Sequence, residues 1–105
     1  MAWTTICRSE EMPAGSIKRK RLPNGDPVAV ARLQDDRLVA FHNECPHFKG
    51  PLGTGAIRDS TIICPWHFFR FDLITGRAVG VGESLMRLKL YEVREQDGEV
   101  AVAFN

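Results

Sequence analysis

The stretch CPHFKGPLGTGAIRDSTIICPWHFFRFDLITGRAVG, residues 45–80, carries the most distinctive pattern of the chain. It brings a cysteine and a histidine together twice, as Cys45/His47 and as Cys64/His67, with a proline after each cysteine. Sixteen residues separate His47 from Cys64. Thiolates and imidazoles are metal ligands, so two such pairs predict a metal centre whose ligands are Cys45, His47, Cys64 and His67.

Two kinds of metal centre compete for this pattern. A structural zinc ion would take the four ligands in a tetrahedron, but zinc sites usually supply like ligands together, as Cys-x-x-Cys or His-x-x-x-His. Here each pair mixes one thiolate with one imidazole. Mixed pairs suit a centre of two metal atoms, as in a Rieske [2Fe–2S] cluster, where two histidines replace two cysteines on one iron. We favour the cluster, and a zinc-stabilised binding module is the alternative.

The rest of the sequence is typical of short strands separated by turns. Pro23, Asn24 and Gly25 mark one turn, and Thr75-Gly76 marks another. No segment keeps a helical period for more than two turns. The pattern predicts an all-β fold, an antiparallel sandwich or small barrel, with both Cys/His pairs in loops. The expected strands occupy residues 15–22, 28–33, 37–41, 56–58, 61–64, 69–73, 85–93 and 99–104.

Residues 45–80 resemble the cluster-binding segment of Rieske proteins. Beyond the two Cys/His boxes, the likeness includes Pro51-Leu52, Phe71-Asp72 and Thr75-Gly76. From WTTIC and EEMPAG onward, the whole chain is similar to soluble Rieske-type ferredoxins. The resemblance implies a single domain over residues 1–105, a Rieske-type antiparallel β-sandwich with a small cluster-binding subdomain of two loops, approximately 43–75. It also implies one [2Fe–2S] cluster per chain, with each histidine binding iron through Nδ1.

Two further observations indicate which kind of Rieske protein the chain resembles. Rieske proteins of the cytochrome bc complexes carry an extra cysteine in each loop, and here those positions hold Gly50 and Trp66. The resemblance therefore points to the soluble branch, which lacks that disulfide. A catalytic oxygenase subunit would also need an iron site of two histidines and a carboxylate. Only His42 remains beyond the predicted ligands, so we expect an electron carrier and not an enzyme.

The family resemblance implies partners as well. We expect electrons to pass from a flavin-dependent NAD(P)H reductase to a terminal, aromatic-ring oxygenase. The small subunit of an NAD(P)H nitrite reductase is the alternative. Phe48 and Phe68 follow the ligand histidines directly and are candidates for partner docking. The formal net charge of +1 gives no indication of nucleic acid or membrane as a partner. We expect a monomer. We also expect it to be cytoplasmic, since no apolar stretch reaches membrane-spanning length.

Other conspicuous residues receive structural interpretations. Cys7 lies in an apolar stretch and is expected to be a small core residue. His42 is expected to be a polar turn residue, and a role in proton exchange or docking is the alternative. The basic run Lys18 to Arg21 would split between two faces of an alternating strand, as expected of a charged edge strand.

Overall fold

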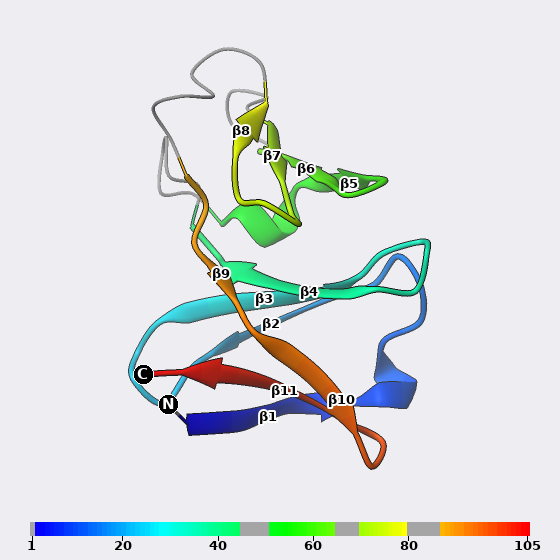
Figure 1. Ribbon diagram of the computed structural model, residues 1–105, viewed down its shortest axis with the longest axis vertical. Coiled ribbons are helices and arrows are strands. Elements are labelled where there is room, and N and C mark those ends of the chain that lie inside the picture. The colour runs from blue at the N-terminus through cyan, green and yellow to red at the C-terminus, as the bar shows by residue number, and fades with distance from the viewer. Residues whose placement is uncertain (1, 45–50, 65–69, 80–86) are drawn as a thin grey trace.

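The computed structural model describes residues 2–44, 51–64, 70–79 and 87–105. These residues form three antiparallel sheets (Figure 1), and the second sheet lies between the other two. The first sheet has the order β1 (Ala2–Arg8), β11 (Glu99–Phe104), β10 (Val93–Gln96). The second has the order β2 (Ile17–Arg21), β3 (Pro27–Arg32), β4 (Leu38–His42), β9 (Leu90–Tyr91). The third has the order β5 (Ala56–Arg58), β6 (Thr61–Ile63), β7 (Arg70–Asp72), β8 (Ala78–Val79).

Two single-turn 3-10 helices complete the described structure, η1 (Ser9–Glu11) and η2 (Leu52–Thr54). The expected all-β fold of antiparallel sheets is therefore confirmed. None of the helices in the described part of the chain is long and apolar enough to cross a membrane.

The central strand β3 explains why the three layers stay together. Val28 and Val30 pack toward the first sheet, in one core cluster with Val100. Ala29 and Ala31 point the other way, into the core shared with the third sheet. Successive side chains of a strand point to opposite faces, so a strand covered on both sides needs an unbroken apolar run. All four residues from 28 to 31 are accordingly fully buried.

The described part of the strand expected over residues 85–93 divides between β9 and β10, and residues 85 and 86 lie outside the described residues. Leu90 pairs with Phe41 of β4 in the second sheet, whereas Val93 pairs with Val102 of β11 in the first sheet. Glu92 lies at the crossing, and its carbonyl accepts a hydrogen bond from the Ala103 N–H at 3.0 Å. The sequence alternates through the crossing because both strands have the same two-residue period, which hides the change of sheet.

The basic strand β2 lies at the edge of the second sheet, as expected. The Lys20 ammonium donates to the Thr5 carbonyl oxygen at 3.1 Å, which places it on the side of the first sheet. Arg19 lies on the opposite side, where its Cγ and Cδ are 3.2 Å from the position of a Cβ built on Gly53. The predicted split of the charges between two faces is confirmed, and a charged edge resists pairing with other chains.

Candidate metal centre

Cys64 is the predicted ligand that the described residues include. It directly follows β6 and is fully buried, in the core cluster that contains Ile62 and Phe71. Because Ile62 and Cys64 are two positions apart, their side chains point to the same inner face of the third sheet. The other predicted ligands and their neighbours lie outside the described residues, namely Cys45, His47, Phe48, Gly50, Trp66, His67 and Phe68.

Asn43 connects the described residues on either side of residues 45–50, the first segment with predicted ligands. Its Oδ1 accepts a hydrogen bond from the backbone N–H of Gly53 at 2.6 Å. Its own N–H donates to the Pro27 carbonyl oxygen at 3.0 Å, which anchors it to β3. A Cβ built on Gly53 would lie 2.8 Å from that Oδ1, so the approach requires glycine. This contact thus holds together the described residues on either side of 45–50.

The described residues on either side of residues 65–69, the second segment with a predicted ligand, lie on neighbouring strands. Ile63 of β6 pairs with Arg70 of β7, and Arg70 pairs with Val79 of β8. Cys64 directly follows the first of these residues. The register therefore places the described residues next to 65–69, and the last described residue before 80–86, in one row across the third sheet.

The turn predicted at Thr75-Gly76 is confirmed and sets this register. Asp72 Oδ1 accepts hydrogen bonds from the N–H groups of Ile74 at 2.7 Å and Thr75 at 3.2 Å. Gly76 has φ of 78°, and a Cβ there would lie 2.5 Å from the Leu88 carbonyl oxygen. Only glycine meets both conditions without strain.

His42 takes part in a chain of polar contacts at the end of β4. Its Nδ1 lies 3.1 Å from the Tyr91 hydroxyl, and its Nε2 lies 2.8 Å from Glu44 Oε1. The Tyr91 hydroxyl also donates to Asp26 Oδ2 at 3.4 Å. Burial, followed by the Asp26 charge, raises the pKa of Tyr91 to about 12, so the phenol keeps its proton. His42 is the last residue of β4 and not the polar turn residue expected from the sequence, and both of its ring nitrogens have polar partners.

Cys7 is partly buried against the core between the first and second sheets and forms no disulfide. Burial, followed by the nearby Glu11 charge, raises the pKa of its thiol. The thiol form is inert compared with the thiolate. Cys7 thus packs against the core, but it is partly buried and not the buried core residue expected from the sequence.

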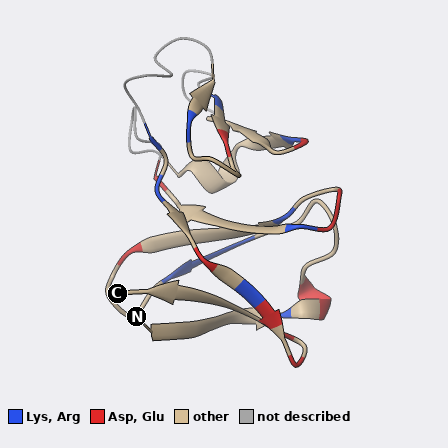
Figure 2. Ribbon diagram, viewed as in Figure 1, with Lys and Arg blue, Asp and Glu red and all other residues tan. Residues whose placement is uncertain are grey.

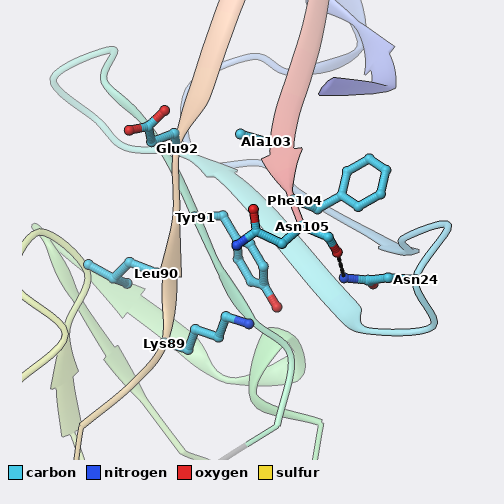
Figure 3. Close-up of a pocket in the computed structure, with 8 residues that line it drawn as sticks. All are labelled: Asn24, Lys89, Leu90, Tyr91, Glu92, Ala103, Phe104 and Asn105. Carbon is cyan, nitrogen blue, oxygen red and sulfur yellow. Dashed lines mark hydrogen bonds between the residues drawn. The ribbon is translucent and has the colours of Figure 1, made fainter. Parts of the chain in front are cut away.

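A surface pocket of about 320 Å³ lies away from Cys64, beside β9 and the end of β11 (Figure 3). The Lys89 ammonium lies 5.0 Å from the Tyr91 ring centre, and the Asn24 side chain donates to the Asn105 carbonyl oxygen at 3.0 Å. Cys64, the predicted ligand within the described residues, does not line this pocket. Within the described ranges, no three His, Cys, Asp or Glu side chains form a group that could hold a metal ion.

Sequence reasoning missed Asn43 as a residue that positions the ligand segment. An asparagine two positions before a ligand cysteine has no distinctive pattern, and its partner Gly53 is ten residues away. A glycine that follows Pro51-Leu52 was the available signal, since a close backbone approach often requires glycine.

Curated relatives cover almost the whole chain. A ferredoxin named CarAc from Metapseudomonas resinovorans is 31% identical over 101 residues, covering 96% of this chain and 92% of the relative. The anthranilate 1,2-dioxygenase ferredoxin subunit of Burkholderia cepacia is 31% identical, covering 90% of this chain and 81% of the relative.

Solved structures agree with the fold described above. The complex of oxygenase and ferredoxin in carbazole 1,9a-dioxygenase contains a chain with a TM-score of 0.86 and 30% identity, covering 95% of this chain and 100% of that one. A Mycobacterium tuberculosis structure assigned as a nitrite reductase small subunit has a TM-score of 0.88 at 24% identity, covering 99% and 96%. The Rieske [2Fe-2S] domain family matches residues 2–92. With buried Cys64 at the end of β6 in a three-sheet fold, the chain belongs to the Rieske [2Fe–2S] domain family.

Proposed function

We propose that this protein is a one-electron carrier of the Rieske ferredoxin type, with its cluster held by Cys45, His47, Cys64 and His67. The observation that carries the proposal is the burial of Cys64 at the end of β6, in a chain matched as a Rieske domain over residues 2–92. A donor set of two thiolates and two imidazoles fits a [2Fe–2S] cluster of this type. The proposed unit is one domain over residues 1–105, with the cluster subdomain at approximately 43–75.

The bound cluster supplies reversible one-electron chemistry, and neutral histidine ligands raise its potential above that of all-cysteine ferredoxins. The chain's own residues provide the setting. The core around Cys64 keeps water from the thiolate, and a dry surrounding influences the potential of a metal centre. Asn43 and the Ile63–Arg70 pair fix the described residues from which both ligand segments start. A carrier needs such rigidity because electron exchange should require little rearrangement.

We propose a flavin-dependent NAD(P)H reductase as electron donor and a terminal, aromatic-ring oxygenase as acceptor. The supporting relatives are ferredoxin components of oxygenase systems, including those for anthranilate and p-cumate. One related ferredoxin has been solved together with its oxygenase. Phe48 and Phe68 are proposed docking residues, and we propose that the carrier works as a monomer in the cytoplasm.

The second candidate is the small subunit of a nitrite reductase, which the Mycobacterium tuberculosis likeness supports at the level of the fold. Electron delivery distinguishes the two. Chemically reduced protein is mixed with an oxygenase component or with a nitrite reductase large subunit, and oxidation of the carrier is followed by absorbance. Preferential oxidation by the oxygenase supports the proposal. Preferential oxidation by the nitrite reductase would reject it in favour of the second candidate.

A further inference from the structure

The outer face of the third sheet carries exposed arginines beside the proposed metal centre. In the β7–β8 pair, Arg70 is opposite Val79, and Phe71 is opposite Ala78. Phe71 and Ala78 are buried, whereas Arg70 and Val79 are exposed. Because strand side chains alternate between faces, Arg70 and Val79 both point outward on the same face.

Two more arginines extend this face. Arg77 precedes Val79 by two residues and forms an antiparallel bridge with Arg87, and both arginines are exposed. Figure 2 shows positive residues on β7, just before β8, and where the described chain resumes after residue 86. We call Arg70, Arg77, Val79 and Arg87 the arginine face.

The positive charges of the arginine face are not neutralised within the described residues. Arg70, Arg77 and Arg87 form none of the ion pairs found there, whereas Arg8, Arg32 and Arg37 each pair with a carboxylate. Like charges directly opposite each other in a sheet are unfavourable, and Arg77 and Arg87 are such a pair.

The acidic residue of β7 does not relieve this repulsion. Asp72 points to the same face as Arg70, two residues earlier, but its Oδ1 accepts hydrogen bonds from the Ile74 and Thr75 N–H groups. Its carboxylate therefore stabilises the turn. As far as the described residues go, the arginine face keeps an unneutralised charge that a carboxylate on another molecule could satisfy.

An exposed apolar residue belongs to the same face. Val79 is 38% exposed, and Ile74 in the adjoining turn is 42% exposed. Apolar side chains beside arginines are typical of protein interfaces, where arginine is enriched. The face also lies close to Cys64, because Ile63, the partner of Arg70, directly precedes that cysteine.

We propose that the arginine face docks a carboxylate-rich surface, with an apolar centre, on the terminal oxygenase. The inference rests on the proposed function, and it names the chemistry of the partner surface. An oxygenase has been solved in complex with a related ferredoxin, which supports the oxygenase as the partner for this face. Docking here would bring the acceptor beside the segment that follows Cys64, and opposite charges would speed the encounter.

The test measures how fast reduced protein passes electrons to an oxygenase component. The probes are the oxygenase components of carbazole 1,9a-dioxygenase and anthranilate 1,2-dioxygenase, and the faster acceptor for wild-type protein is used. Dithionite-reduced holoprotein is mixed with it in stopped flow at low and high ionic strength. We compare wild type with the double variant Arg77→Gln/Arg87→Gln. The matched control is Arg8→Gln/Arg37→Gln, which removes two exposed charges from other parts of the fold.

We expect the second-order rate constant of the arginine-face variant at low salt to be about tenfold below that of wild type. The variant should also lose most of the salt dependence of this rate constant, because steering is electrostatic. The rate at saturating oxygenase should stay near the wild-type value. The control variant should behave as wild type. The reduction potential of each variant is measured as well, so that a change in driving force is not mistaken for weaker docking.

Equal rate constants and equal salt slopes for both double variants would overturn the inference while leaving the proposed function intact. A slower reaction with the flavin reductase alone would also overturn it, because the face would then belong to the electron donor. If wild-type protein reduces neither oxygenase but reduces a nitrite reductase, the proposed function fails, and the inference fails with it. Should the double variant not hold its cluster, Arg70→Gln and Val79→Ser test the same face separately.

Discussion

At the scale of single residues, the short hydrogen bond between Asn43 and Gly53 fixes the described residues on either side of 45–50. The Gly53 N–H is buried, and the Asn43 side chain is its hydrogen-bond acceptor at 2.6 Å. Cys64 could be predicted as a ligand because its motif is local in sequence. The Asn43 contact could not, because it joins residues on opposite sides of the segment 45–50.

Replacing Asn43 by alanine should therefore destabilise the protein by about 1–3 kcal/mol, the usual cost of a buried amide left without its acceptor. We expect the cluster absorbance to decay faster on warming, since the segment containing Cys45 loses its anchor. Asn24→Ala is the matched control, because Asn24 also accepts a backbone N–H, from Asp26 at 2.9 Å, but in an exposed turn. An equal loss of stability in both variants would show that Asn43 has no special position.

Substitution of a proposed histidine ligand by cysteine tests the ligand set itself. His47→Cys and His67→Cys each replace a neutral imidazole by a thiolate, which adds negative charge to the cluster. Variants that keep a cluster should have a lower reduction potential than wild type, measured by spectroelectrochemical titration. A variant with the wild-type spectrum and potential would remove that histidine from the ligand set.

At the scale of elements, one partly buried ion pair connects the second sheet to the first. Arg32 of β3 is 7% exposed, and its Nη2 donates to Glu95 Oε2 of β10 at 2.8 Å. Its Nε also donates to the Met12 carbonyl oxygen at 2.8 Å. Neither contact could be predicted from the sequence, because both join residues that are far apart in the chain. For the ion pair, 63 residues separate Arg32 from Glu95. The strand β1 was missed for a related reason, as a bulge between Thr5 and Cys7 breaks its alternation.

The Arg32–Glu95 pair predicts a pH dependence of stability. The hydrogen bond from Arg32 lowers the pKa of Glu95 from its ordinary value of 4.5. A lowered folded-state pKa means that the contribution is fully present above the unfolded pKa and is lost as pH falls through the folded one. Between pH 6 and pH 3 the melting temperature of wild type should fall more steeply than that of Glu95→Gln. Glu99→Gln is the control, and a slope for Glu95→Gln equal to wild type would contradict the assignment.

At the scale of the whole molecule, β3 separates two apolar cores, of which one contains the proposed ligand Cys64 and the other does not. One contains Met12 and lies between the first and second sheets, and the other contains Ile62 and Cys64 beneath the third sheet. The apolar run of β3 was evident in the sequence, but not that its two faces serve different cores. That division depends on which sheet each neighbour joins, as the crossing at Glu92 also shows.

Two matched side-chain truncations test whether the two cores have separate effects on stability and on the cluster. Met12→Ala and Ile62→Ala each remove a fully buried side chain and should cost on the order of 2–5 kcal/mol of unfolding free energy. Only Ile62→Ala should also change the reduction potential and the cluster spectrum, because Ile62 shares its core with Cys64. Chemical denaturation and redox titration of both variants check this. A shift of similar size in the potential of Met12→Ala would argue against two separate cores.

The central claim is that this fold holds a Rieske cluster, and electron paramagnetic resonance of the reduced protein tests it most directly. The measurement is made on purified protein together with metal analysis. We predict a red-brown protein with about two iron atoms per chain and the resonance signal of a reduced Rieske centre. A colourless protein that carries roughly one zinc ion per chain and gives no signal would contradict the account.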